Sequence, residues 1–229
     1  KGYTIVPFET VSDILEVKAA VLAVRENTDL PVFVSLSYQS DMRTFVGCDP
    51  KTAAIALSAL DVDAIGVNCS LGPKELENIV DTLLEYSSVP VLVQPNAGLP
   101  KIKDGQTVYE VEPKEYSRYI CEFAQKGAAI LGGCCGTTPD FIREVCENLK
   151  SRKRTKTNPK SITAITSGTK TVEFDNNITV IGERINPTGK KKLKEALREN
   201  NMSYILSEAI GQGERGAQKA LPHRVLCRL

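Results

Sequence analysis

Three cysteines of this 229-residue chain have the pattern of a metal site. Cys134 and Cys135 are adjacent in the segment GGCCGT, and Cys69 lies far upstream in GVNCS. Each follows an apolar run that gives way to a polar, glycine-bearing loop. Three protein sulfurs with one open position are typical of catalytic zinc, whereas structural zinc sites use protein ligands at all four positions. We therefore expect Cys69, Cys134 and Cys135 to bind zinc and to leave the fourth position for a substrate.

The adjacent pair alone allows simpler interpretations. Two neighbouring cysteines can be inert buried side chains or a vicinal disulfide. The segment GGCCGTTP precedes a helical run and could also bind phosphate through its backbone amides. Cys48, Cys121 and Cys146 lie in helical or pre-helical sequence, where we expect small buried side chains.

The composition excludes several classes of function. The chain has 29 basic and 28 acidic residues, and a net charge of +1 creates no global field for nucleic acid or an anionic membrane. No apolar run is long enough to span a bilayer, and the first residues do not resemble a signal peptide. Seven cysteines, two of them adjacent, fit reduced thiols better than a disulfide framework. We expect a cytoplasmic protein whose partners include neither nucleic acid nor membrane.

Residues 1–150 alternate β-rich and helical runs. Apolar periodicity predicts five strands, at residues 3–8, 31–37, 62–68, 89–94 and 128–132. It predicts a helix after each strand, at residues 12–26, 50–60, 73–86, 113–126 and 139–151. Four of these helices have proline in the first turn, where its missing N–H is harmless. Strands joined by such helices run parallel, so the pattern predicts five β-α units.

Polar residues follow several of these strands and should gather at one edge of the sheet. In a (β/α)8 barrel the carboxyl ends of the strands hold the active site, and all three cysteines would share this rim. A closed barrel needs eight strands, so the five units predict a partial (β/α)8 TIM barrel.

The remaining residues are expected to form a linker and the start of another domain. Residues 151–178 combine a basic, polar linker with a hairpin formed by residues 162–166 and 171–174. Residues 179–229 begin with a strand at 179–182 and continue with helices at 190–200 and 203–221, as at the opening of a second TIM-type barrel. Residues 222–229 fit no pattern, and we expect this second domain to be truncated.

Four segments together resemble a known family. GVNCS, VPVLVQPNAGLP and GAAILGGCCGTTP resemble the homocysteine-binding, zinc-dependent methyltransferase domain, and VIGERINPTGKKKLKEAL resembles the opening of a methyltetrahydrofolate-binding, or pterin-binding, domain. In this order they resemble the family of cobalamin-dependent methionine synthases. Betaine-dependent and stand-alone homocysteine methyltransferases lack the pterin module, so the second match separates this chain from them.

The resemblance implies methyl transfer to the thiol of homocysteine, giving methionine. Zinc would activate the thiolate, and methyltetrahydrofolate would supply the methyl group through methylcobalamin on a cobalamin-binding module absent from this chain. Two alternatives stay open, namely a catalytically incomplete zinc-binding fragment of that enzyme and a homocysteine methyltransferase with another methyl donor. An unrelated aldolase-type barrel is disfavoured because no lysine stands at a strand end, and Lys101 and Lys103 are expected in a loop beyond one.

The resemblance also implies roles for individual residues. The three cysteines match the zinc ligands. Glu9 matches a carboxylate that anchors the substrate's amino group, although it could equally be an ordinary rim carboxylate. Asn68 and Asn96 would contact substrate beside the metal, and Asn96 could fill the fourth zinc position when substrate is absent. Glu183 and Asn186 match positions that line the pterin pocket, although a capped turn would explain them as well.

Overall fold

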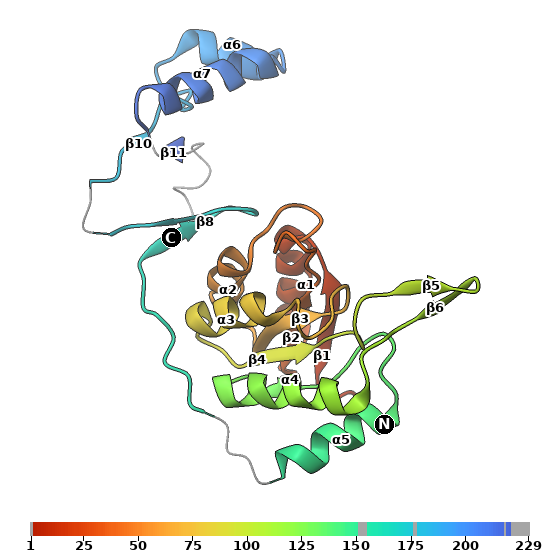
Figure 1. Ribbon diagram of the computed structural model, residues 1–229. Coiled ribbons are helices and arrows are strands. Elements are labelled where there is room, and N and C mark those ends of the chain that lie inside the picture. Colours follow the sequence, from red (N-terminus) through yellow and green to blue (C-terminus); the bar gives the residue numbers. More distant parts are fainter. Residues whose placement is uncertain (1, 151–154, 176–177, 218, 221–229) are drawn as a thin grey trace. The chain divides into compact units, whose positions relative to one another are not determined.

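A computed structural model describes residues 2–150, 155–175, 178–217 and 219–220 (Figure 1). The chain divides into a first unit, Lys1–Glu173, and a second unit, Phe174–Leu229. Part of the predicted linker, residues 151–154, and the unassigned segment 222–229 lie outside the described residues. Among the helices that the structure describes, none combines the length and the apolar character needed to cross a bilayer.

The first unit is built on a five-stranded parallel sheet with the strand order β1-β2-β3-β4-β7. Its strands are β1 Val6–Val11, β2 Val32–Leu36, β3 Ala64–Asn68, β4 Val91–Gln94 and β7 Ile130–Leu131. Its helices are α1 Ile14–Asn27, α2 Pro50–Ser58, α3 Glu77–Tyr86, α4 Pro113–Lys126 and α5 Pro139–Leu149. The predicted alternation of five strands with five helices is confirmed.

The order of the strands determines where the helices lie. Neighbouring strands follow one another along the chain apart from the inserted β5 and β6, and each helix contacts the next one. Right-handed crossovers between consecutive parallel strands place their helices on the same face of the sheet. The unit therefore has the winding of a (β/α) barrel rather than of a doubly wound sheet.

Four helices are predicted to have proline in the first turn, and all but one of them do. The Asp49 side chain accepts a hydrogen bond from Thr52 N at 2.8 Å, and Pro50 occupies the first turn of α2. The exception is α3, which begins at Glu77 rather than at Pro73. The residues after Pro73 form turns, and no side chain caps the helix at Leu76.

Strand β1 lies three residues later than the sequence predicted. It spans Val6–Val11, and its register against β2 shifts between Phe8 and Val11. Thr10, in this irregular section, has a φ of 59°. The irregularity resembles a β-bulge, which re-aims side chains and often lies next to active sites. Glu9, expected after the strand, therefore lies within it.

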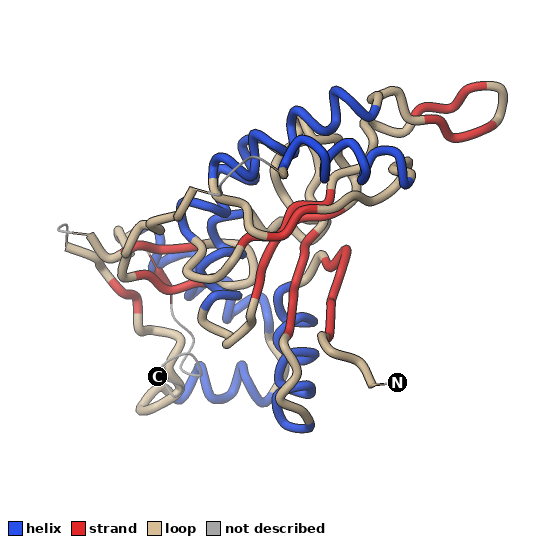
Figure 2. The backbone as a smooth tube through the Cα atoms, turned by 90° about the horizontal axis from the view of Figure 1, so that it is seen from below, coloured by secondary structure: helices blue, strands red, loops and turns tan. Residues whose placement is uncertain are grey.

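Between β4 and α4 the chain forms a hairpin that the sequence analysis missed. Strands β5 (Lys101–Lys103) and β6 (Gln106–Val108) pair antiparallel and project from the rest of the unit (Figures 1 and 2). Asp104 and Gly105 have φ values of 49° and 76°, as a two-residue hairpin turn requires. The expectation of a loop at Lys101 and Lys103 was therefore wrong.

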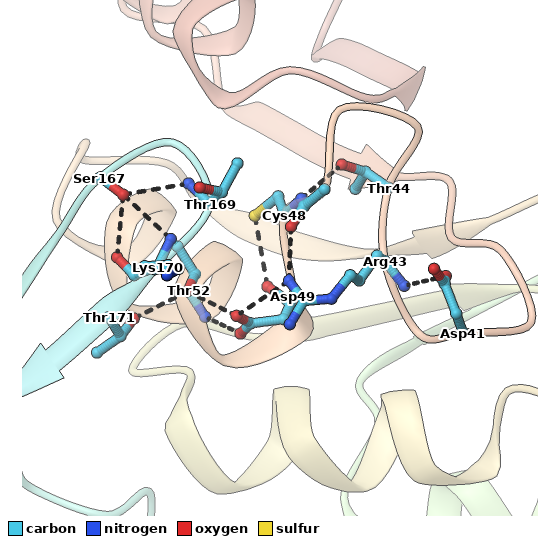
Figure 3. A network of polar contacts seen from close by, with 11 residues as sticks. Asp41, Arg43, Thr44, Cys48, Asp49, Thr52, Ser167, Thr169, Lys170 and Thr171 are labelled. Carbon is cyan, nitrogen blue, oxygen red and sulfur yellow. Dashed lines mark hydrogen bonds and ion pairs between the residues drawn. The ribbon is translucent and has the colours of Figure 1, made fainter. Parts of the chain in front are cut away.

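The hairpin predicted at residues 162–166 and 171–174 is present, and it packs on the start of α2. Strands β8 (Ala164–Thr166) and β9 (Thr171–Glu173) pair antiparallel. The hydroxyl groups of Thr52 and Thr171 lie 3.0 Å apart, and Thr52 in turn contacts the capping carboxylate of Asp49 (Figure 3). The hairpin thus belongs to the first unit.

The second unit contains a short strand followed by two helices. These are β10 (Ile181–Gly182), α6 (Lys191–Arg198) and α7 (Met202–Glu214), and β10 pairs with β11 (Lys219–Ala220). Helix α7 ends at Glu214, well before residue 221, because Gly216 just after it favours a turn. Gly216 has a φ of 88°, and its N–H donates to Gly213 O at 2.9 Å.

A buried tyrosine joins the ends of β4 and β7. The side chain of Tyr116 is fully buried, and its hydroxyl lies 3.1 Å from Pro95 O and 2.8 Å from Gly132 O. Its ring packs edge-on against Phe141 with 5.3 Å between centroids. Because both carbonyls belong to the loops after the strands, Tyr116 fixes the spacing of these loops.

We predict that Tyr116→Phe lowers the free energy of unfolding by about 1–3 kcal/mol, because the buried hydroxyl that bonds the carbonyls of Gly132 and Pro95 is removed. Urea denaturation followed by circular dichroism measures the change. Tyr3→Phe, at a residue that is 88% exposed, is the control and should leave the midpoint unchanged. Equal midpoints for the Tyr116 variant and the parent chain would contradict this role.

Candidate metal centre

The three predicted cysteines meet at the carboxyl edge of the sheet. The sulfur atoms of Cys69, Cys134 and Cys135 all lie within 4.8 Å of one another. The distances are 3.6 Å between Cys69 and Cys135 and 4.0 Å between Cys134 and Cys135. Tetrahedral zinc with Zn–S bonds of about 2.3 Å requires sulfurs about 3.8 Å apart. These residues therefore fit a soft divalent metal with little movement, and the adjacent pair is not a disulfide.

Cys69 is held in an unusual backbone conformation directly after β3. Its φ is 62°, and that of Ser70 is 59°, so two consecutive residues with side chains occupy the left-handed region. The N–H of Cys69 donates to Gln94 O at 3.1 Å, which extends the pairing of β3 with β4 by one residue. Residues kept in such sparsely populated conformations cluster at functional sites.

The loop after β4 positions the loop that bears the adjacent pair. Cys134 N donates to Pro95 O at 2.8 Å, and Ala97 N donates to Cys135 O at 2.9 Å. The side chain of Asn96 adds a third bond, because its Oδ1 accepts from Cys135 N at 3.1 Å. Both cysteines are thus fixed through their own backbone groups.

The two predicted asparagines are buried and bonded to protein. Asn68 Oδ1 accepts from Thr10 N at 2.8 Å and from Ser35 Oγ at 2.7 Å, and Asn68 Nδ2 donates to Thr10 Oγ1 at 2.7 Å. Asn68 is 2% exposed and Asn96 is 3% exposed. Both side chains therefore position the strand ends, and their contact with substrate stays a prediction.

Glu9 is placed on the rim, although the structure gives it no fixed partner in the cluster. Its side chain is exposed and lies within the irregular section of β1, next to Thr10, which binds Asn68. The strand end is thus tied to the residue that precedes Cys69. The predicted anchoring of an amino group by Glu9 stays a prediction.

Glu183 and Asn186 contact each other in the second unit. Asn186 Nδ2 donates to Glu183 Oε1, and Asn186 Oδ1 accepts from Thr188 N at 3.0 Å. Lys190 Nζ lies 3.7 Å from Glu183 Oε2. These bonds form a capped turn before α6, and a pterin-binding role for the two residues stays a prediction.

The remaining described cysteines lie apart from the cluster. Cys48 and Cys121 are buried, as expected. Cys146 is exposed, so its expected burial was wrong: helix α5 buries Phe141 and Val145 and turns Cys146 outward.

Burial and the neighbouring sulfurs oppose the ionisation of the Cys134 thiol. Burial raises the pKa of the Cys134 thiol to about 12, and Cys69 and Cys135 act in the same direction. Three neighbouring thiolates would repel one another, whereas a divalent cation between them would compensate their charge. The cluster is therefore suited to a cation.

Tyr109 is a residue of this site that the sequence analysis did not identify. It follows β6, and its half-buried ring lies against Gly136, directly after the cysteine pair. Burial, and next the adjacent Cys135 thiol, raise the pKa of Tyr109. The Asp-Gly turn between β5 and β6 is the signal that could have revealed the hairpin and thus the return of Tyr109 to the rim.

We predict that zinc affinity of the chain rises with pH. Because the Cys134 thiol has a pKa of about 12, metal binding must displace its proton. Between about pH 6 and 8 the affinity should rise about tenfold per pH unit for each thiol that loses a proton on binding. Competition with a chromophoric chelator, corrected for the chelator's own protonation, measures this dependence. An affinity independent of pH would contradict thiolate ligation.

Comparison with known proteins assigns the family. Residues 1–149 match the family model described as homocysteine S-methyltransferase. The chain is 34% identical over 217 residues to "Methionine synthase" of Mycobacterium tuberculosis and 33% identical over 230 residues to that of Mycobacterium leprae. These matches cover 91% and 94% of this chain but only 18% and 19% of the relatives, so the chain spans about a fifth of their length.

Solved structures show the same fold at lower identity. The metallated form of the homocysteine methyltransferase MmuM from Escherichia coli has a TM-score of 0.53 and 20% identity, covering 64% of this chain and 46% of that protein. Its oxidized form gives a TM-score of 0.54 with the same identity and coverage. With the family model matching well over half of its residues, the chain belongs to the homocysteine S-methyltransferase family.

Proposed function

We propose that this chain binds zinc through Cys69, Cys134 and Cys135 and transfers a methyl group to the thiol of homocysteine, giving methionine. The observation that supports this most strongly is the meeting of three sulfurs within 4.8 Å at the carboxyl edge of a parallel sheet. The family model and the methionine synthase relatives support the same reaction.

The chain's own residues prepare the site for a fourth sulfur. Zinc, when bound, acts as a Lewis acid that lowers the pKa of a coordinated thiol and presents it as a thiolate at neutral pH. Three anionic protein sulfurs keep the site electron-rich, which makes a further sulfur more nucleophilic than it would be beside neutral imidazoles. The backbone bonds at Cys134 and Cys135 keep the protein ligands fixed while substrate exchanges.

Residues around the cluster would orient the amino acid. Glu9, exposed on the rim, is proposed to bind the substrate's ammonium group. Asn96 is proposed to lie beside the open position and to fill it through its amide when homocysteine is absent, although its Oδ1 accepts from Cys135 N at 3.1 Å. Asn68 is proposed to contact substrate from the neighbouring strand end.

The methyl donor and the second domain complete the proposal. We propose that the first unit is part of a (β/α)8 barrel of residues 1–150, that residues 151–178 form a linker with a hairpin, and that residues 179–229 open a second, pterin-binding barrel. Glu183 and Asn186 would line its pocket for methyltetrahydrofolate. The methyl group would reach homocysteine through methylcobalamin on a further module, in a cytoplasmic setting that keeps the thiols reduced.

A second candidate function is that of a zinc-binding fragment that does not catalyse methyl transfer. It is favoured by the five strands of the described sheet, since a closed barrel has eight. Metal binding by the chain combined with no methyl transfer would support this candidate, and transfer from a donor other than methylcobalamin would support a different donor specificity.

We predict that Cys135→Ala abolishes stoichiometric zinc binding and methyl transfer to homocysteine, because two sulfurs no longer retain the metal tightly. Metal analysis after dialysis gives the zinc content, and the formation of methionine from added methylcobalamin gives the activity. Cys146→Ala is the matched control, since this exposed cysteine lies outside the cluster and its loss should change neither quantity. Tightly held, stoichiometric zinc in Cys135→Ala would overturn the assignment.

A further inference from the structure

We propose that the side-chain amide of Gln94 binds the ammonium group of homocysteine, with its Oε1 as the acceptor, while the substrate's thiol lies on the metal. This role rests on the proposed function, because it assumes that the cysteine cluster binds zinc and homocysteine. Gln94 is the last residue of β4. Its buried amide oxygen, which has no hydrogen-bond partner among the described residues, points to a ligand.

The Gln94 side chain lies on the face of the sheet opposite the helices. Val67 and Val93 are fully buried in the core that the strands share with the helices. Successive side chains of a strand point to opposite faces. Asn68 and Gln94 are register partners that each follow one of these valines, so both amides point to the other face. In a (β/α) barrel that face is the interior, at whose carboxyl end substrates bind.

A glycine on the neighbouring strand end makes room for this side chain. A Cβ at Gly132 would come within 3.2 Å of Gln94 Cγ and within 3.5 Å of its Nε2. The φ of Gly132 lies outside the left-handed region, so its backbone conformation does not require glycine. A larger residue would instead press on the glutamine. The Gln94 amide thus lies beside the start of the loop in which Cys134 follows two residues later.

Gln94 stands between the two loops that bear the metal ligands. Its backbone O accepts from Cys69 N at 3.1 Å, and the O of the next residue, Pro95, accepts from Cys134 N at 2.8 Å. In homocysteine only a short carbon chain separates the sulfur from the amino group. A substrate whose sulfur occupies the fourth position of the metal therefore keeps its ammonium close to the strand ends that hold the cysteines.

The amide oxygen of Gln94 needs a donor that the described part of the chain does not supply. The amide oxygens of Asn68 and Asn96, at the same edge, both accept from protein N–H groups, whereas Gln94 Oε1 is buried without a partner. An unpaired buried carbonyl costs free energy. Once its thiol has lost its proton, homocysteine has one donor group, the ammonium. A charged donor makes a stronger hydrogen bond than a neutral one.

The test compares Gln94→Met with the parent chain, both loaded with zinc. Methionine has a similar length and removes the amide. We expect the Kd for homocysteine, from isothermal titration calorimetry, to rise about 10–100-fold, as for the loss of a hydrogen bond to a charged group. The Kd for 4-mercaptobutanoate, which is homocysteine without its amino group, should equal that of the parent chain. The zinc content should also be unchanged.

The stability of the same variant gives a second readout. Without homocysteine, Gln94→Met should have a higher urea midpoint than the parent chain, because it no longer buries an unpaired oxygen. A glutamine with a merely structural role would give the opposite sign, since its removal would lower the midpoint. Tighter folding together with weaker homocysteine binding is therefore the result expected for a residue that keeps its oxygen free for substrate.

Controls separate this inference from the proposed function. Gln125→Met, at an exposed glutamine of α4, should leave both Kd values and the midpoint as in the parent chain. If Gln94→Met binds homocysteine as tightly as the parent, or weakens both thiols equally, the role of Gln94 is wrong while the proposed function stands. If the parent chain binds no zinc, or binds zinc but no homocysteine, the proposed function fails and the inference fails with it.

Discussion

The metal centre depends on backbone hydrogen bonds between the ends of neighbouring strands, because these bonds hold the three cysteines in place. The last residue of β4 accepts from Cys69 N through Gln94 O, and the loop after β4 accepts from Cys134 N through Pro95 O and donates from Ala97 N to Cys135 O. Each bond fixes one cysteine where its strand has just ended, so the sulfurs meet without help from their own side-chain packing. Parallel strands make this possible because all their carboxyl ends lie at one edge. Tyr116, bonded to the carbonyls of Pro95 and Gly132, holds the two loops apart at a constant distance.

The same bonds explain why buried polar groups surround an exposed site. Asn68 and Asn96 are almost fully buried, yet their amides bond to Thr10, Ser35 and Cys135 rather than remaining unpaired. Buried amides left without partners would destabilise the fold, whereas paired ones specify the loop geometry. The cysteines themselves are only partly covered, so a ligand can reach them from solvent. A metal-assisted transfer requires metal ligands that the fold holds rigidly and that substrate can still reach from solvent.

Local patterns in the sequence were sufficient for most of the fold. Apolar periodicity and helix-initiating prolines predicted five β-α units, because both signals arise within a few residues. The position of β1 was wrong because its irregularity near Thr10 depends on pairing with β2, which no local pattern reveals. The meeting of Cys69 with the adjacent pair was predicted from strand ends alone. Tyr109 was missed because the Asp-Gly turn at residues 104–105 was not interpreted as a hairpin, and the partners of Asn68 depend on tertiary contacts.

The central claim is that three cysteine sulfurs bind zinc and leave its fourth position to the substrate's thiol. X-ray absorption at the zinc edge tests it most directly, because it counts sulfur neighbours of the metal. The account predicts three sulfurs and one lighter atom for the zinc-loaded chain, and four sulfurs at about 2.3 Å after homocysteine is added. A sulfur count that stays the same when homocysteine saturates the protein would contradict the account.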